Sequence, residues 1–174
     1  MNHVISALVE NKPGVLARVS SMFARRGFNI HSLAVGPTVD PNMSLITIVV
    51  DGPEMEQIIK QLYKLVNTVK VTELGPEEGV IREIMLVRVN SDPTKRAEMI
   101  ESASVFSARP VDVGAATITF EISGDPEHLS NFLELMRTYG IIELAQSGRI
   151  ALPKDRKTKR HTTASTKSAR MDPS

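Results

Sequence analysis

Residues 4–27, VISALVENKPGVLARVSSMFARRG, decide the fold because they place a strand, a tight turn and a helix in succession. Residues 4–9 are a short apolar run without a breaker, which predicts a buried strand. The turn-forming residues 11–14 end that strand. Gly27, directly after two arginines, is typical of the end of a helix. Between them, apolar residues recur at the spacing of one helical face: Val15, Leu16, Val19, Met22 and Phe23.

The sequence after Gly27 extends this pattern to six elements. Runs rich in β-branched residues predict strands over 28–35, 45–50 and 69–74. A second helix is predicted between the last two of these strands. The six elements then follow the order β-α-β-β-α-β. The apolar stripe of that helix is the clearest helical signal in the chain: Met55, Ile58, Ile59, Leu62, Leu65 and Val66.

The same order of elements recurs after a Gly- and Pro-containing linker at 75–79. Strands are predicted over 80–89, 109–113, 116–122 and 141–145. The third helix has a thin stripe of Ala97, Ile100 and Ser104, and the fourth has a fuller one of Leu129, Phe132, Leu133 and Met136. The aspartates that precede the three later helices, Asp51, Asp92 and Asp125, are expected to be helix caps.

These patterns predict an α+β protein made of two tandem ferredoxin-like βαββαβ domains. We expect the first domain over 1–75, the second over 80–153, and a basic disordered tail over 154–174, where Lys and Arg recur without periodicity. A unit of this size leaves one sheet face bare. Because Leu45, Ile46, Ile48 and Val49 place apolar residues on both faces of one strand, we expect a second copy to cover the sheet, which makes a homodimer.

The composition excludes several classes of protein. The chain has no Cys, so disulfides, thiolate metal sites and a thiol nucleophile are excluded. Hydrophobic residues make up 41% and charged residues 24%, which is normal for a globular protein. The first residues lack the pattern of a signal peptide, and no apolar run approaches the ~20 residues of a membrane span. We expect a cytoplasmic protein without a membrane partner.

The turn after the first strand has the chemistry of an anion site. A helix begins there, and its free N–H groups and dipole favour a carboxylate. Gly14 lets a ligand approach the backbone, and Asn11 offers both donors and acceptors. Pro13 stiffens the turn, and Val15 and Leu16 are expected to offer apolar surface. The plain alternative is a turn that binds nothing, since Asn-Lys-Pro-Gly is also ordinary turn chemistry.

The residues around this turn resemble the ACT-domain family, and more narrowly the small regulatory subunits of acetolactate (acetohydroxyacid) synthase. The resemblance rests on 10–19, ENKPGVLARV, and on 23–33, FARRGFNIHSL. Further signatures are 60–66, 82–87 and the Gln-Ser-Gly at 146–148. Together they extend the resemblance over about residues 1–153, which includes the second domain but not the basic tail.

The resemblance implies a regulatory role rather than a catalytic one. In that family the first domains pair side by side and bind valine at their interface, which gives feedback inhibition in the synthesis of valine, isoleucine and leucine. The effector-binding residues it implies are Asn11, Lys12, Pro13, Gly14, Val15 and Leu16, with Asn29 and Ile30 from the partner's second strand. Lys12 and Pro13 stand at variable positions and are expected to shape the turn. The resemblance implies no cofactor in this chain; the large subunit partner carries thiamine diphosphate, Mg²⁺ and FAD.

Other readings of the sequence are weaker. The four histidines, His3, His31, His128 and His161, have no partners at metal-ligand spacing, and His31 is expected at the rim of the interface. An amino-acid-sensing transcription regulator that holds DNA with the basic tail is the alternative function. The tail has no aromatic residues and no helix-turn-helix pattern precedes it, so we expect no nucleic-acid partner. A chain that condenses pyruvate by itself is a third reading, and no residue pattern supports it.

Overall fold

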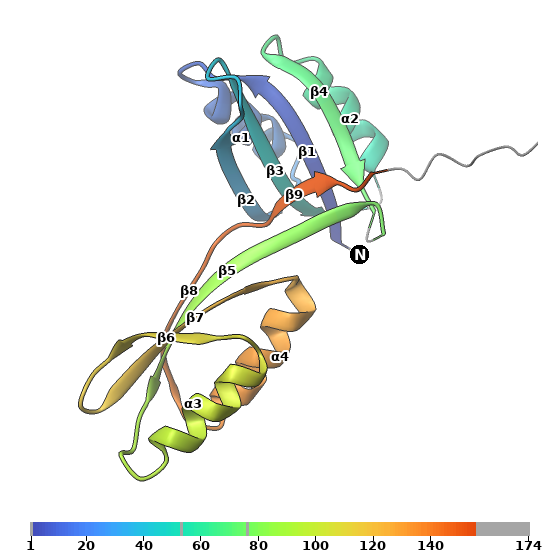
Figure 1. The fold of residues 1–174 in the computed structure, drawn as a ribbon. Coiled ribbons are helices and arrows are strands. Elements are labelled where there is room, and N and C mark those ends of the chain that lie inside the picture. The colour runs from blue at the N-terminus through green and yellow to red at the C-terminus, as the bar shows by residue number, and fades with distance from the viewer. Residues whose placement is uncertain (1, 53, 76, 156–174) are drawn as a thin grey trace, which may run out of the picture.

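The structure, a computed structural model, describes residues 2–155 except 53 and 76, and it contains two units that each pack two helices on an antiparallel sheet (Figure 1). The first unit has the sheet order β2-β3-β1-β4. Its elements are β1 (Asn2–Glu10), α1 (Val15–Arg25), β2 (Ile30–Pro37), β3 (Met43–Asp51), α2 (Met55–Tyr63) and β4 (Thr68–Leu74).

The second unit repeats this topology with the order β6-β7-β5-β8. Its elements are β5 (Gly79–Asn90), α3 (Arg96–Val105), β6 (Arg109–Val113), β7 (Thr117–Gly124), α4 (Pro126–Arg137), β8 (Ile141–Gln146) and β9 (Ile150–Pro153). In both units the first and third strands are central and the fourth strand pairs with the first, as in a ferredoxin-like fold. The predicted fold class, two tandem ferredoxin-like units, is confirmed.

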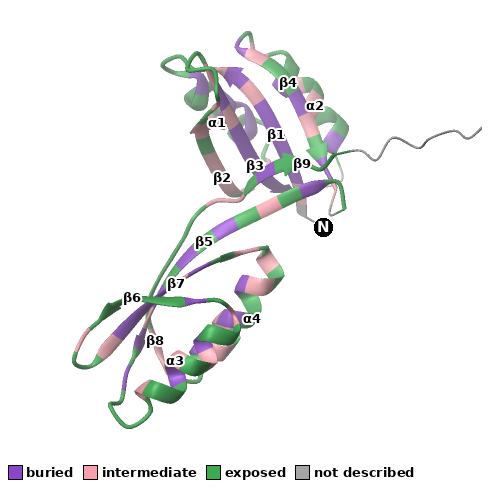
Figure 2. Ribbon diagram, in the orientation of Figure 1, coloured by how far each residue is buried: buried purple, intermediate pink, exposed green. Residues whose placement is uncertain are grey.

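The core of the first unit lies between its sheet and its helices (Figure 2). Alternate residues of β1 and β3 point to the helices because side chains alternate along a strand. Phe23 and Ile58 fill the layer from the helix side and are almost completely buried. Of the helical face predicted from Val15, Leu16, Val19, Met22 and Phe23, all but the exposed Leu16 form the buried face of α1. Helix α2 ends at Tyr63, so the stripe predicted for it is wrong at Val66, which is exposed.

The core of the second unit differs from the prediction at α3. The stripe predicted at Ala97, Ile100 and Ser104 is wrong, because Ala97 and Ser104 are exposed and Ile100 is only partly buried. Met99 and Ala103 form the buried face instead. This helix has few apolar residues on any face. The periodicity therefore did not determine which face is buried, and the prediction chose the wrong one.

Of the three predicted caps, only Asp125 has that role. Its carboxylate accepts a hydrogen bond from the backbone N–H of His128 (2.9 Å) at the start of α4. Asp92 instead accepts from the backbone N–H of Thr94 in a turn that precedes α3. Asp51 ends β3, and one of its oxygens meets His31 Nε2. An aspartate before a helix pattern therefore marked a cap at Asp125, a turn at Asp92 and the end of a strand at Asp51.

Strand β9 was not predicted, and it changes the account of the bare sheet face. It pairs antiparallel with the first residues of β5, from Gly79 to Arg82. Ala151 of β9 packs with Val4 and Val49, on the face of the first sheet that the helices do not cover. The chain therefore covers part of that face with its own β9 and the beginning of β5, rather than leaving all of it to a second copy.

The predicted basic tail at 154–174 lies outside the described residues apart from Lys154 and Asp155. Within the described part of the chain, no helix is both long and apolar enough to cross a membrane.

The packing of β9 predicts a contrast between two neighbouring residues. Ala151 is 3% exposed and Leu152 is 63% exposed. Ala151→Asp places a carboxylate without a partner in an apolar contact, and we expect it to cost about 3 kcal/mol and to detach β9. Leu152→Asp adds the same charge to the exposed face and serves as the matched control. Hydrogen exchange at the amides of β9 and of Gly79–Arg82 measures the effect; equal protection in both variants would contradict this packing.

The Asp125 cap predicts a pH dependence of stability. The hydrogen bond from the His128 N–H holds the pKa of Asp125 below its ordinary value. Its contribution is therefore complete above the pKa of the unfolded chain, about 4, and is lost as the pH falls through the lower folded pKa. Asp125→Ala should lower the free energy of unfolding by about 1 kcal/mol at neutral pH. Asp125→Asn should keep the cap and lose this pH dependence; urea unfolding at pH 7 and below pH 4 tests both.

Candidate functional site

The turn between β1 and α1 is held by hydrogen bonds from Asn11 to the backbone of the β2–β3 turn. The N–H of Asn11 donates to the carbonyl of Asn42 (2.7 Å), and the Asn11 side-chain amide donates to the carbonyl of Pro41 (3.0 Å). One amide hydrogen of Asn11 is thus occupied by the protein. Its second amide hydrogen and its Oδ1 remain the groups with which it can bind a ligand.

Gly14 stands at the N-cap of α1 with φ +84°, a left-handed conformation that favours glycine. It has no side chain to accept a hydrogen bond from the first turn of the helix. A Cβ built at Gly14 would meet no atom within 4 Å among the described residues, so the space in front of the helix start is open. Open space and first-turn N–H groups together make the kind of position where a carboxylate binds.

A polar network fixes the beginning of this turn. The Asn67 side chain donates to Glu10 Oε2 (2.5 Å) and accepts from Arg18 Nη1 (2.8 Å). The Glu10 N–H donates to the Asn67 carbonyl (2.9 Å), and Lys12 Nζ lies 3.2 Å from Glu10 Oε2. The Asn67 amide, and then Lys12, lower the pKa of the Glu10 carboxyl below its ordinary value. Asn67 and Arg18 were missed from the sequence because residues 49 positions apart carry no local pattern that links them.

Of the two apolar residues predicted to line the site, only Leu16 presents its side chain. Leu16 is 42% exposed, whereas Val15 is 6% exposed and packs in the core of the first unit. The expected apolar surface from Val15 is therefore wrong for its side chain. Pro13 and Lys12 are exposed on the turn.

Asn29 and Ile30 lie at the other end of the sheet from the turn. Ile30 pairs with Val50 of β3, whereas Glu10, the last residue before the turn, pairs with Met43. The seven residue steps along β3 from Met43 to Val50 span about 23 Å at the rise of a strand. One chain therefore does not bring the two groups of predicted site residues together. Asn29 is exposed, and Ile30 is partly buried against the core.

The histidines do not gather into a site. His31 meets Asp51, His3 Nδ1 lies 2.9 Å from Glu73 Oε1, and His128 Nε2 lies 2.9 Å from the carbonyl of Phe106. His161 lies outside the described residues. Among residues 2–155 that the structure describes, no group of three His, Cys, Asp or Glu is placed to hold a metal ion.

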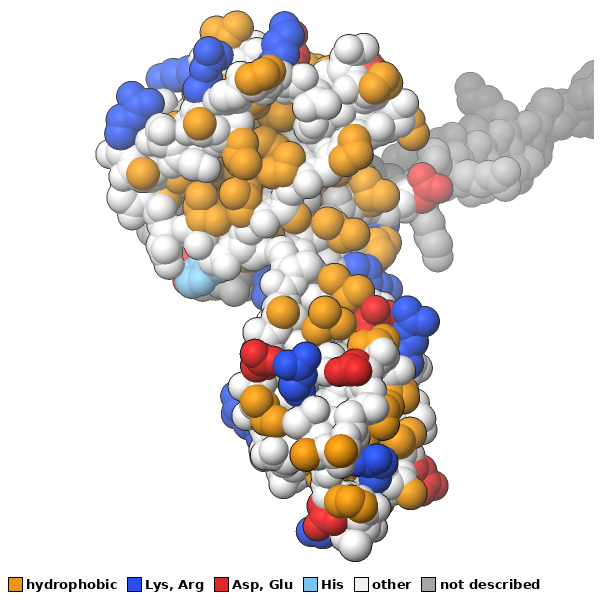
Figure 3. Space-filling view, turned by 90° about the vertical axis from the view of Figure 1, so that its left-hand side faces the viewer, with side chains coloured by type: hydrophobic (Ala, Val, Ile, Leu, Met, Phe, Trp, Pro, Cys, Tyr) orange, Lys and Arg blue, Asp and Glu red, His pale blue; other side chains and the backbone are white. Residues whose placement is uncertain are grey.

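A shallow groove of about 740 Å³ runs between the outer face of β2–β3 and strand β9. Its walls include Ala34, Leu45 and Leu152, and hydrophobic side chains gather on this side of the first unit (Figure 3). None of the eight residues predicted to bind the effector lines it. The groove and the predicted site are therefore separate features of the same sheet.

Each of the two units matches the model of a known protein family. The first, residues 5–70, matches the AHAS small subunit-like ACT domain. The second, residues 82–155, matches the family described as the small subunit of acetolactate synthase.

Individual relatives are similar to this chain over most of its length. The chain is 50% identical over 159 residues to a probable acetolactate synthase small subunit of Archaeoglobus fulgidus, covering 90% of this chain and 99% of the relative. It is 50% identical over 153 residues to the acetolactate synthase small subunit of Mycolicibacterium smegmatis, covering 86% and 89%. The crystal structure of the acetolactate synthase small subunit from Thermotoga maritima superposes with a TM-score of 0.82 at 38% identity, covering 90% and 99%. With both units matched and this identity maintained, the chain belongs to the family of acetolactate synthase small subunits.

Proposed function

We propose that this chain regulates acetolactate synthase by binding its catalytic large subunit, raising its activity and conferring feedback inhibition by valine. The observation that carries the proposal is the open, uncapped start of α1 at Gly14, in a chain whose relatives are acetolactate synthase small subunits. The catalytic cofactors, thiamine diphosphate, Mg²⁺ and FAD, belong in this proposal to the large subunit.

The valine site is shared between two copies of the chain. Strand β2 is at the edge of the first sheet, and among the described residues it pairs only with β3. An edge strand offers free backbone groups to a second strand. If the β2 strands of two copies pair antiparallel, the start of β2 in one copy approaches the end of β2 in the other. The end of β2, Pro37, pairs with Ser44 beside the Asn11 turn, so Asn29 and Ile30 of the partner come to that turn.

The residues at this position match the groups of an amino acid. The N–H of Val15 donates to the Lys12 carbonyl (3.4 Å), so the next N–H groups of the first turn of α1 would bind the carboxylate at the positive end of the helix dipole. Asn11 Oδ1 would accept from the ammonium group. Leu16, which is exposed in the first turn of α1, and Ile30 of the second copy would contact the branched side chain.

Inhibition then follows from linkage. An effector shifts an equilibrium only by its difference in affinity for the two states. Valine held by both copies favours the relative orientation of the two first units in which all its contacts are made. The large subunit senses that orientation through the rest of the small subunit. A coupling of 1–3 kcal/mol, typical of allosteric proteins, corresponds to roughly a 5–150-fold change in affinity.

Substitution at either half of the shared site tests the proposal. Gly14→Asp places a carboxylate against the valine carboxylate while retaining a residue that tolerates a left-handed backbone. Asn29→His removes the contact from the other copy. Each is expected to raise the valine concentration for half-inhibition of the reconstituted enzyme at least tenfold, a loss of about 1.4 kcal/mol.

Ser21→Asp is the matched control, since it adds the same charge to the exposed side of α1 about 10 Å along the helix. It should leave inhibition unchanged. All three variants should still raise the activity of the large subunit in the absence of valine. Unchanged inhibition in both Gly14→Asp and Asn29→His would refute the site assignment.

A further inference from the structure

The Gln146-Ser147-Gly148 signature lies where the second unit touches strand β2 of the first. The chain leaves β8 at Gln146 and reaches β9 at Ile150, and between them it passes against β2. The N–H of Arg149 donates to Ser32 Oγ of β2 (2.8 Å). A Cβ at Gly148 would collide with the backbone carbonyl of Leu33, so only glycine allows this approach.

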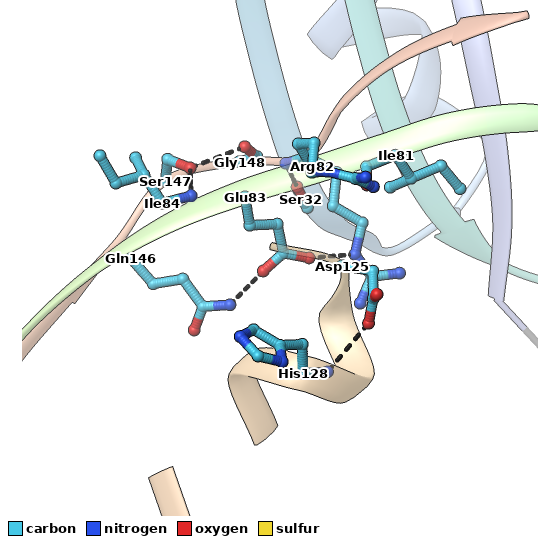
Figure 4. A network of polar contacts seen from close by, with 11 residues as sticks. Ser32, Ile81, Arg82, Glu83, Ile84, Asp125, His128, Gln146, Ser147 and Gly148 are labelled. Atoms are coloured by element: carbon cyan, nitrogen blue, oxygen red, sulfur yellow. Dashed lines mark hydrogen bonds and ion pairs between the residues drawn. The ribbon is translucent and has the colours of Figure 1, made fainter. Parts of the chain in front are cut away.

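The same segment is anchored to β5 by a nearly buried carboxylate. Glu83 of β5 has a side chain that is 3% exposed, and it forms an ion pair with Arg149 Nε. Its other oxygen accepts a hydrogen bond from the Gln146 side chain. Ser147 makes two hydrogen bonds with the backbone of Ile84. The Ser147 N–H donates to the Ile84 carbonyl (2.9 Å), and the Ile84 N–H donates to Ser147 Oγ (3.0 Å). Figure 4 shows Glu83 at the centre of this network, with Ser32 beside it.

The β2 end of this contact is two residues from the proposed effector contacts. Ile30 pairs with Val50, but Ser32 pairs with Val49, so the register shifts by one residue and β2 has a bulge at His31. Val50 faces the helices and Val49 faces the outer side of the sheet. The bulge therefore directs Ile30 to the helix side and Ser32 to the outer side, where Arg149 lies. A change in the bulge moves both residues together.

We propose that the contact of Ser32 with the Gly148-Arg149 segment, fixed by Glu83, transmits effector binding from the first unit to the second. The inference rests on the proposed function. A ligand that contacts Ile30 would alter the bulge, shift Ser32, and displace the segment that β5 and Glu83 hold. Because β5 pairs with β9 at its beginning and with β7 and β8 further along, a displacement there reorients the second sheet. Ser32, Gly148 and Glu83 are positioning residues and do not bind the effector.

Binding and inhibition, measured separately on the same variants, test this inference. Ser32→Ala removes the acceptor of the Arg149 N–H, and Gly148→Ala pushes the segment off β2 without changing any charge. We expect both full-length variants to bind valine by calorimetry with a Kd within about twofold of the unsubstituted chain. In the reconstituted enzyme, the inhibited fraction of activity at saturating valine should fall to less than half of its normal value.

Two controls separate this role from a general loss of structure. Ser32→Thr keeps a hydroxyl and should restore most of the inhibition. Gly114→Ala, in the β6–β7 turn, adds a methyl group whose nearest neighbours are 3.4 Å away, and should change neither property. Thermal unfolding followed by circular dichroism checks that Ser32→Ala is folded, and as a partly exposed position it should be.

The outcomes distinguish the two proposals. Normal inhibition of Ser32→Ala and Gly148→Ala would overturn the transmission role and leave the valine site intact. Loss of valine binding in these variants would also overturn it, because the contact would then be part of the site. Failure of the unsubstituted chain to bind valine would overturn the proposed function, and with it the transmission role that depends on it.

Discussion

The antiparallel ladder of the first sheet is the constraint on which the account depends. Its register places the Asn11–Leu16 turn at one end of the sheet and Asn29–Ile30 at the other, about 23 Å apart. No side chain spans that distance. A site that uses both ends therefore requires two copies, and the unpaired edge of β2 among the described residues is where a second copy can be added. A ligand held by two copies reports on their relative orientation, which a site inside one copy does not do.

The turn itself is built so that its backbone, rather than its side chains, faces the ligand. Gly14 has a left-handed φ and caps α1 without a side-chain acceptor, which leaves first-turn N–H groups for a carboxylate. The Glu10–Asn67–Arg18 network and the bonds from Asn11 to the β2–β3 turn fix the backbone from both sides. Because the donors are held before a ligand arrives, binding costs little ordering of the protein.

Much of the fold follows from periodicity, and the failures have physical causes. The topology was predicted correctly, and so were the positions of α1, α2 and α4, which have strong apolar faces. The predicted faces were wrong at Leu16 of α1, which is exposed, and at Val66, which lies beyond the end of α2 and is exposed. The buried face of α3 was predicted wrongly because its apolar residues are sparse, so Met99 and Ala103 were not distinguished from their neighbours. Strand β9 was missed because its four residues are too few to show a period. It is held by β5 and by Val4 and Val49, which are distant in sequence. In the candidate site the turn residues were identified from their chemistry and family resemblance, whereas the buried side chain of Val15, the support from Asn67 and the contact of Ser32 with Arg149 depend on tertiary packing.

The central claim is that each valine site takes its turn from one copy and Asn29 from the other. The most direct test mixes two chains that each fail to bind valine, Gly14→Asp and Asn29→His, after denaturation and joint refolding. A mixed dimer then contains one site with both substitutions and one with neither. The account predicts that calorimetry of a statistical mixture recovers about a quarter of the normal number of valine sites, each with normal affinity. A mixture that forms mixed dimers and still binds no valine would contradict the account, because it would mean that both groups act within a single chain.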